Sequence, residues 1–502
     1  MSVTEIYTKR EPRTSVLYKT IAGHIDAYFT EIEAQGQRIP KYVRNEFEGF
    51  LKCGILAHGF VRIGCSDCKS ERMVAFSCKK RGFCSSCGAR RQAELVDYLS
   101  EKVFVDVPVR QYVLSLPFEV RYWFACSGKL MGECYRIFAH EVERQLCKKS
   151  TAVKARSGTV AVLQRFSSDL SLNPHIHLLA PDGVFISKTT GREKFEAVSA
   201  ISDEQVQLLT ERVSAKIIRL LVRRKYIVEE EVSAEAQQEK IFEDAPWVTE
   251  NIKASTVYRI AHGPRAGQQV RKLGIVRDSE SKNADHSDRG PRCSEARGFS
   301  LHCNSVAKDK AALQKLASYI ARPAISTERL TLQDSGDLIY RLKKMWRNGV
   351  EAVALSPYEF LERLVALIPP FYSHTTRYSG VYGPAARNRN QVTLERIVGP
   401  NKKTSNPHAR GKNARIAWAQ LLKKVFRFDL TVCLRCGGPT RLIGTVFSKS
   451  GISKILDHLG LESGPPSRGG GNNGWGAPLQ EWHHQHSPTH TLGQEQFSEF
   501  GL

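Results

Sequence analysis

The sequence predicts an α+β fold, in which an antiparallel sheet carries helices and is preceded by a helical, cysteine-rich region. Two observations predict the sheet. Runs of β-branched or aromatic residues occur at 112–116 and at 159–166, and both runs are bounded by turn or polar residues. The third observation predicts the helices, because apolar residues recur with helical spacing at 15–35 and 129–147. Strands and a helix in this order are typical of an antiparallel sheet with helices on one face.

Charge and length narrow the possible functions. The chain has 502 residues, so we expect about two to four domains. Lys and Arg number 74 against 51 Asp and Glu, a surplus of 23 positive charges that favours nucleic acid as a partner, although a merely soluble basic protein has the same composition. The sequence has no apolar run of about 18 residues and no signal peptide, so we expect a cytoplasmic protein outside membranes.

Cysteines dominate the region after a helix predicted at 41–52. In a cytosolic chain, 13 cysteines favour metal ligands or free thiols over disulfides. Cys65-x-x-Cys68 and Cys84-x-x-Cys87 form two knuckles separated by fifteen residues, a spacing that predicts one tetrahedral zinc site. Three leftover residues either build a second zinc site with an unnamed fourth ligand or are simply buried: Cys53, His58 and Cys78.

Basic residues flank the second knuckle, near a helix predicted at 89–102. Such side chains either contact the phosphates of a nucleic acid or form a solvated charged face. The candidates for DNA contact here are Lys79, Lys80, Arg81, Arg90 and Arg91.

A pair of histidines lies inside the apolar run 172–179. Because successive side chains of a strand point to opposite faces, His175 and His177 share a face and offer half of a divalent-metal site. Alone, such a pair is more often structural than functional. Gln164 becomes a third ligand in one register only, which sets it opposite His175, because a slip of one residue turns it away.

Other strands complete the predicted sheet. A further run at 103–107 is expected to be a strand, and the turn signal Asp182-Gly183 predicts a hairpin between the histidine strand and 184–186. A long helix is expected at 202–225. The chain should return to the sheet as a strand at 299–306.

A helix predicted at 309–321 carries a candidate nucleophile. Tyr319 lies in its last turn, with Lys315 one turn earlier and Arg322 three residues later. A tyrosine with basic neighbours can attack phosphate, because cations stabilise the phenolate and the charge that builds at phosphorus. The alternative is a tyrosine that caps a core helix.

The C-terminal half contains a predicted hairpin at 330–343 and predicted helices at 358–367 and 411–425. Cys433-x-x-Cys436 is half of a zinc knuckle with no second half nearby, so a zinc site there is left open.

With these motifs in place, the chain resembles rolling-circle transposases of the HUH superfamily, the group formed by insertion-sequence family ninety-one and its common-region (ISCR) relatives. The resemblance covers about residues 15–460. It rests on six motifs: Cys53-Gly54 with His58-Gly59-Phe60, the run from Ser77 to Cys87, Leu114-Ser115-Leu116-Pro117, the run from Leu172 to His177, Asp182-Gly183-Val184-Phe185, and Tyr319-Ile320-Ala321-Arg322-Pro323.

The resemblance implies DNA transposition by nicking and joining of single-stranded element ends. It makes His175 and His177 the ligands of Mg²⁺ or Mn²⁺, and Tyr319 the nucleophile that forms a 5′-phosphotyrosine link. Two-tyrosine members carry another tyrosine at the position of Lys315, so the chain is similar to the single-tyrosine, ISCR-like branch. The sequence has no Gly-x-x-x-x-Gly-Lys-Ser/Thr loop, which agrees with a reaction that does not use ATP.

The resemblance and the composition together divide the chain into four parts. These are a helical zinc-binding domain at 15–102, a nuclease domain at 103–345 with a flexible or DNA-facing insertion at 262–297, a C-terminal accessory domain at 346–460, and a disordered, Gly- and Pro-rich tail at 461–502.

Two other functions remain open from the sequence. A plasmid-type replication-initiation or relaxase nuclease would use the same residues. A zinc-containing DNA-binding regulator would need the cysteines and not the histidines or the tyrosine.

Overall fold

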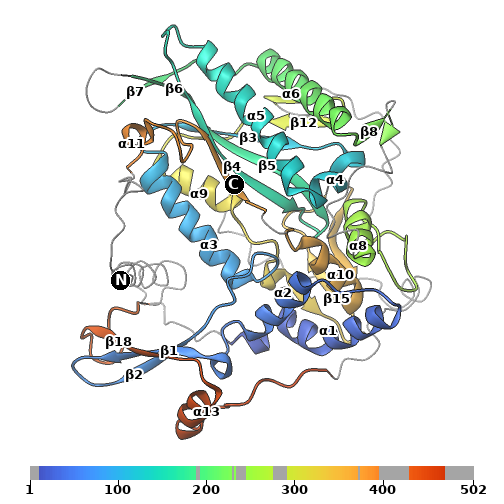
Figure 1. Ribbon diagram of the computed structural model, residues 1–502, viewed down its shortest axis with the longest axis vertical. Helices are drawn as coiled ribbons and strands as arrows, with labels where there is room; N and C mark the ends of the chain where they lie inside the picture. Colours follow the sequence, from blue (N-terminus) through green and yellow to red (C-terminus); the bar gives the residue numbers. More distant parts are fainter. Residues whose placement is uncertain are drawn as a thin grey trace.

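The computed structural model describes residues 11–187, 193–228, 231–232, 245–274, 291–346, 348–370, 373–394 and 429–469. Within them an α+β fold, as predicted, is built around an antiparallel seven-stranded sheet (Figure 1). Neighbouring strands follow the order β11-β12-β3-β5-β4-β17, and β13 also pairs with β3. Their bounds are β3 (Val109–Ser115), β4 (Gly158–Phe166), β5 (Leu172–Pro181), β11 (Cys293–Ala296), β12 (Phe299–His302), β13 (Val306–Ala307) and β17 (Thr376–Gly380).

Helices cover both faces of this sheet. Side chains of β5 alternate, so Ile176 belongs to one core cluster and Leu179 to the other. The first cluster includes residues of α5 (Gly128–Lys148) and α6 (Asp203–Arg223), and the second includes residues of α9 (Lys310–Ile320). The sheet is therefore enclosed, and not covered on one face only, because β5 is apolar on both sides.

The N-terminal region begins with the two predicted helices, α1 (Val16–Ala34) and α2 (Lys41–Lys52). They pack through aromatic side chains, with the Phe29 and Phe47 rings 5.7 Å apart and edge to face. The short strands β1 (Phe60–Cys65) and β2 (Glu71–Ala75) follow, and then α3 (Ser85–Tyr98), which continues as a π turn, η3 (Leu99–Val103).

Two local predictions are wrong. No strand forms at 103–107, where Asp106 has a φ of 54°, far from extended backbone. The histidine strand makes no hairpin at Gly183 either, because β6 (Gly183–Ile186) pairs with β7 (Lys194–Ala197). Gly183 is needed for this close approach, since a Cβ there would lie 2.3 Å from the carbonyl oxygen of Glu196.

The C-terminal half is distributed over three sheets. A smaller sheet has the order β10-β16-β15-β14, while β17 extends the main sheet beside β4 and β18 pairs with β1. The stretch 346–460, predicted as an accessory domain, thus contributes strands to sheets that also contain strands from the predicted regions 15–102 and 103–345. The bounds are β10 (Arg271–Gly274), β14 (Leu330–Leu332), β15 (Leu338–Arg341), β16 (Val350–Leu355), α10 (Pro357–Leu367), β18 (Thr440–Val446) and α13 (Lys449–His458).

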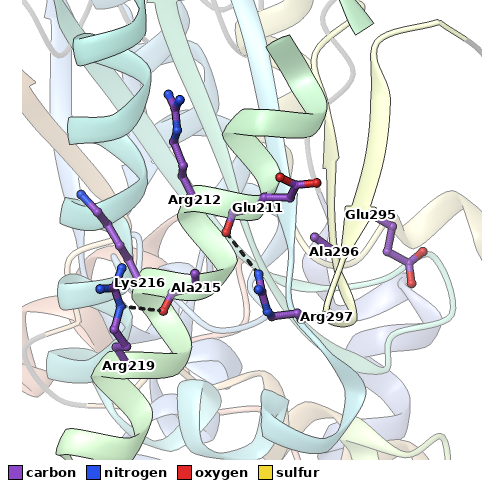
Figure 2. Close-up of a pocket in the computed structure, with 8 residues that line it drawn as sticks. All are labelled: Glu211, Arg212, Ala215, Lys216, Arg219, Glu295, Ala296 and Arg297. Atoms are coloured by element: carbon purple, nitrogen blue, oxygen red, sulfur yellow. Dashed lines mark hydrogen bonds between the residues drawn. The ribbon is translucent and has the colours of Figure 1, made fainter. Parts of the chain in front are cut away.

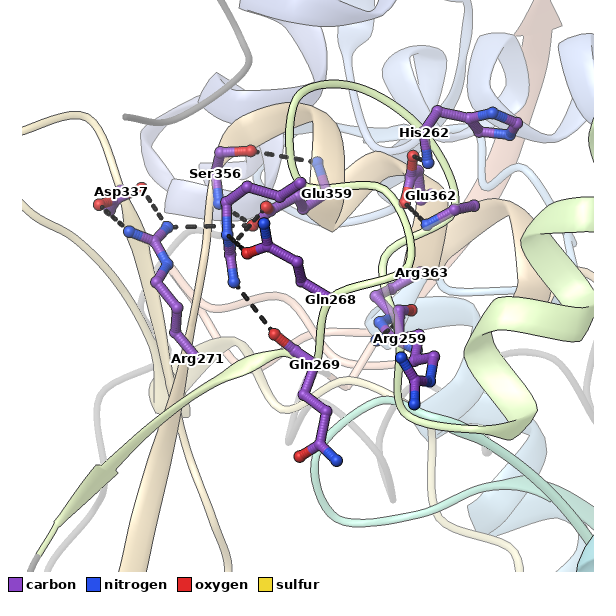
Figure 3. Close-up of polar contacts among 12 residues, drawn as sticks. Arg259, His262, Gln268, Gln269, Arg271, Asp337, Ser356, Glu359, Glu362 and Arg363 are labelled. Carbon is purple, nitrogen blue, oxygen red and sulfur yellow. Dashed lines mark hydrogen bonds and ion pairs between the residues drawn. The ribbon is translucent and has the colours of Figure 1, made fainter. Parts of the chain in front are cut away.

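A buried polar network fixes the first part of the predicted insertion 262–297 (Figure 3). Arg265 Nη1 lies 2.6 Å from a carboxylate oxygen of Glu359, and Arg271 forms a two-pronged pair with Asp337 at 2.7 and 3.0 Å. These charges are paired where they are buried, so this part of the insertion is ordered.

The remaining elements among the described residues are mostly short, and they are η1 (Pro12–Thr14), η2 (Leu56–His58), η4 (Phe118–Val120), α4 (Arg121–Cys126), β8 (Ile227–Val228), β9 (Glu231–Val232), α8 (Pro246–Thr256), η6 (Thr327–Arg329) and α11 (Arg389–Val392). None of the described helices is long and apolar enough to cross a membrane. Three predictions lie outside the described residues, namely the insertion at 275–290, the helix at 411–425 and the tail from 470.

Candidate active site and metal centres

Three side chains of β4 and β5 converge on one face of the sheet. The strands pair so that Gln164 lies opposite His175, which is the register that the sequence required for a third ligand. The Nε2 atoms of His175 and His177 are 3.0 Å apart, and Gln164 Oε1 lies 3.3 Å from His177 Nε2. Two imidazoles and an amide oxygen therefore point at a common position.

The separation of these atoms fits a divalent ion. Two ligand atoms at about 2.1 Å from an ion and at right angles to each other are about 3.0 Å apart. Burial lowers the pKa of His175 to about 4, despite its hydrogen bond to Asn173, and lowers the pKa of His177 well below its usual value. Both imidazoles are thus neutral at pH 7, the form in which histidine binds metal.

Hydrogen bonds on the far side of each ring orient the pair. His175 Nδ1 donates to the carbonyl oxygen of Asn173 at 2.7 Å, which leaves the Nε2 lone pair free. Nε2 of Gln111, a buried residue on β3, lies 2.7 Å from His177 Nδ1. A half-turn of this amide presents its oxygen to Nδ1–H of His177, and Nε2 of His177 is then free to bind a metal. Gln111 was not predicted from the sequence, although a polar residue within an otherwise apolar run could have pointed to it.

Tyr319 lies beside the histidines at the end of α9. Its ring centroid is 6.0 Å from that of His177, and its side chain is 44% exposed. Gln164 joins the two elements, because its Nε2 donates to the carbonyl oxygen of Ile320 at 2.9 Å. The predicted nucleophile and the predicted metal ligands are therefore adjacent, and Tyr319 is open to solvent.

Two cations flank the Tyr319 ring. The guanidinium carbon of Arg322 is 5.5 Å from the ring centroid and the ammonium of Lys343 is 5.0 Å from it. Arg322 Nε is buried without a hydrogen-bond partner among the described residues, so it can still donate to an anion. Lys315 is exposed one turn earlier, and Lys343 was missed because it comes from a distant segment.

The cysteine-rich region docks directly onto this site. Gln92 of α3 donates to the carbonyl oxygen of Ser318 at 2.6 Å. Gly88 lies so close to Pro323 that an added Cβ would approach the Pro323 Cβ to 2.8 Å. The helix that follows the second knuckle thus supports the end of the helix that carries Tyr319.

A cavity of about 600 Å³ with a basic lining lies between α3 and the end of α9. Gln164 and Arg322 border it from the candidate active site, and Arg81 and Arg91 border it from the cysteine-rich region. The other basic candidates lie outside this lining: Arg90 pairs with Glu94 at 3.5 Å, and Lys79 and Lys80 offer their carbonyl oxygens to Arg91.

A second concavity, of about 560 Å³, lies between α6 and the β11–β12 turn (Figure 2). Its lining mixes Arg212 and Lys216 with Glu211 and Glu295, and Arg297 is held by the carbonyl oxygen of Glu211. Because α6 packs on the sheet face opposite α9, this concavity is remote from Tyr319.

The cysteines group differently from the prediction. Cys84 and Cys87 join Cys53 and Cys78, with Sγ–Sγ distances of 3.5 to 3.8 Å for three of the pairs. Thiolates at about 2.3 Å from a tetrahedral zinc ion lie about 3.8 Å apart, so this cluster fits zinc. Its members come together because the C-terminal end of α2 meets the N-terminal end of α3, and the segment between β2 and α3 brings Cys78 beside them.

The predicted pairing of the two knuckles in one site is therefore wrong. The hairpin β1–β2 carries Cys65 and Cys68 away, and they lie beside Cys433 and Cys436. His58 belongs to neither cluster. The spacing of fifteen residues is compatible with a single zinc site, but the strand β2 lies between the two knuckles and holds them apart.

Two family models match the chain. Residues 24–116 match the model described as "Transposase zinc-binding domain", and residues 158–391 match the model described as "Putative transposase". No curated protein and no solved structure matches the chain. The matched descriptions and the thiol cluster define a zinc-binding transposase, which acts on DNA. Within that class, the two matches support a transposase of the type of insertion-sequence family ninety-one.

Disruption of the cluster of Cys53, Cys78, Cys84 and Cys87 should release one zinc ion. We expect Cys87→Ser to lower the zinc content by one ion per chain and to unfold the region around α3, because structural zinc contributes folding free energy directly. Metal analysis and thermal unfolding measure the two effects. Cys147→Ser, outside both clusters, is the matched control. A variant that loses zinc and keeps the wild-type melting temperature and DNA affinity would contradict this role.

Proposed function

We propose that the protein nicks and rejoins single-stranded DNA at element ends by tyrosine transesterification, as in rolling-circle transposition. The observation that carries the proposal is the convergence of His175, His177 and Gln164 beside Tyr319, with ring centroids of His177 and Tyr319 6.0 Å apart. Mg²⁺ or Mn²⁺, held by the three ligands, would supply Lewis-acid polarisation of the scissile phosphate.

Tyr319 performs the covalent step. Its hydroxyl loses a proton and the oxygen bonds to phosphorus, while the bond from phosphorus to the 3′-oxygen breaks and that oxygen takes up a proton. The product is a 5′-phosphotyrosine and a free 3′-hydroxyl. Attack by the 3′-hydroxyl of another strand reverses the step, so the phosphodiester energy is conserved and ATP is not needed.

The flanking cations hold the substrate and stabilise charge. Arg322 and Lys343 lie close enough to Tyr319 to favour its phenolate and the negative charge at phosphorus. Arg81 and Arg91 line, from the zinc-binding region, the cavity that Arg322 also borders, so one DNA strand would contact both regions. The replication-initiator alternative shares this chemistry, and the matched transposase families favour transposition.

Covalent capture tests the proposal. The protein is incubated with Mg²⁺ and a single-stranded oligonucleotide that contains an element end, labelled at either terminus, and then separated on a denaturing gel. We expect a labelled protein band when the label lies 3′ of the nick, because the enzyme keeps the 5′ phosphate. DNA binding without any adduct under these conditions would support the non-catalytic regulator instead.

Gln111 should act on the reaction through His177. We expect Gln111→Leu to lower metal affinity by about 10- to 100-fold, because the hydrogen bond that orients the ring is lost. Nicking rates measured against Mn²⁺ concentration should show a raised half-saturation point and partial recovery at high Mn²⁺. Gln145→Leu on α5 is the control, and an unchanged half-saturation point in Gln111→Leu would remove this positioning role.

A further inference from the structure

A cluster of four thiols combines cysteines from opposite ends of the described chain. We propose that Cys65, Cys68, Cys433 and Cys436 bind a second zinc ion, which clamps the C-terminal segment 429–458 to the N-terminal hairpin β1–β2. The matched zinc-binding family ends at residue 116, so two of the four ligands lie outside it. The inference does not depend on the nicking reaction.

The thiols are spaced as zinc ligands. Cys65 Sγ lies 3.5 Å from Cys436 Sγ, Cys68 Sγ lies 3.6 Å from Cys433 Sγ, and all four sulfurs are within 4.8 Å of one another. Tetrahedral thiolate ligands of zinc are about 3.8 Å apart, whereas a disulfide would need about 2.0 Å. The second half of the Cys433 knuckle, absent from its sequence neighbourhood, is thus the first knuckle of the chain.

The backbones of the two knuckles match each other. The Cys433 amide donates to the carbonyl oxygen of Gly438 at 2.8 Å. In the first knuckle the Cys65 amide donates to the carbonyl oxygen of Ser70 at 2.9 Å, which is the equivalent bond. Gly437 has a φ of 74°, the left-handed conformation that glycine adopts most readily. The Ser66 amide donates to the carbonyl oxygen of Pro439 at 3.0 Å, so the two turns are also bonded to each other.

The packing around this site explains why a clamp is needed. Every residue of β18 is exposed or half-buried where the strand lies on β1. Of the described residues, the cluster beneath has three fully buried members, Phe60, Ile452 and Leu456. A core of that size is too small to hold a module in place, and small modules generally depend on metals or disulfides.

Zinc stoichiometry of the full chain tests the proposal. We expect two zinc ions per chain in the wild type, one in the Cys433→Ser/Cys436→Ser variant, and two in the Cys147→Ser control. Limited proteolysis should cut within 429–458 in the double variant and leave this segment intact in the control. A wild type with one zinc, or a double variant that keeps two, would overturn the site.

Cobalt titration keeps the test valid if the double variant does not fold. Co²⁺ bound by thiolates gives charge-transfer absorption, which Co²⁺ bound by His175 and His177 without thiols does not produce. Metal-free wild type should reach full absorption at two equivalents of Co²⁺, and saturation at one equivalent would refute the second site. Because neither readout uses DNA cleavage, the result is independent of the proposed nuclease function.

Discussion

Replacement of Tyr319 by phenylalanine should abolish the covalent protein–DNA adduct and reduce nicking by about 10³-fold or more, as expected when a nucleophile is removed. The change deletes one oxygen from a side chain that is 44% exposed, so stability should change by less than about 0.5 kcal/mol. The denaturing-gel assay measures the adduct, and circular dichroism confirms that the variant is folded.

Tyr378→Phe is the matched control, because Tyr378 is half-buried and packs against Tyr98 and Arg389. It should form the adduct at the wild-type rate. If Tyr319→Phe still forms the adduct, the nucleophile lies elsewhere and the single-tyrosine assignment fails. Tyr382 is a poor substitute, since it is fully buried against Phe104, and burial raises its pKa.

Replacement of both His175 and His177 by alanine should abolish nicking and leave most DNA binding intact. The imidazoles supply two of the three proposed metal ligands, whereas affinity for DNA comes mainly from phosphate contacts of basic side chains. We expect nicking to fall to background and the dissociation constant for a single-stranded oligonucleotide to change by less than about threefold, since the phosphate contacts of Arg81, Arg91 and Arg322 remain.

The control is His140→Ala, an exposed histidine on α5, the helix that packs on the opposite face of the sheet. Nicking at close to the wild-type rate in the double variant would place the metal at another site. A loss of DNA binding equal to the loss of nicking would indicate instead that the histidines hold the strand pair together.

Much of this molecule could be predicted from local patterns. Strand alternation placed His175 and His177 on one face, and helical spacing placed Tyr319 in the last turn of α9. These predictions hold because the periods of strands and helices are set by backbone geometry within a few residues. The hairpin predicted from the turn signal at Gly183 is wrong, because this glycine instead allows a close contact with the backbone of Glu196.

The sequence by itself determined the chemical inventory: paired histidines on one strand face, a tyrosine at a helix end, zinc-binding thiols and a basic surplus. Only the tertiary structure decided which of these meet. It set the register that brings Gln164 to the histidines, added Gln111 and Lys343, and separated the two N-terminal knuckles. The physical reason is that a ligand set closes through space, so Cys68 and Cys433, 365 positions apart, become neighbours only after the chain has folded.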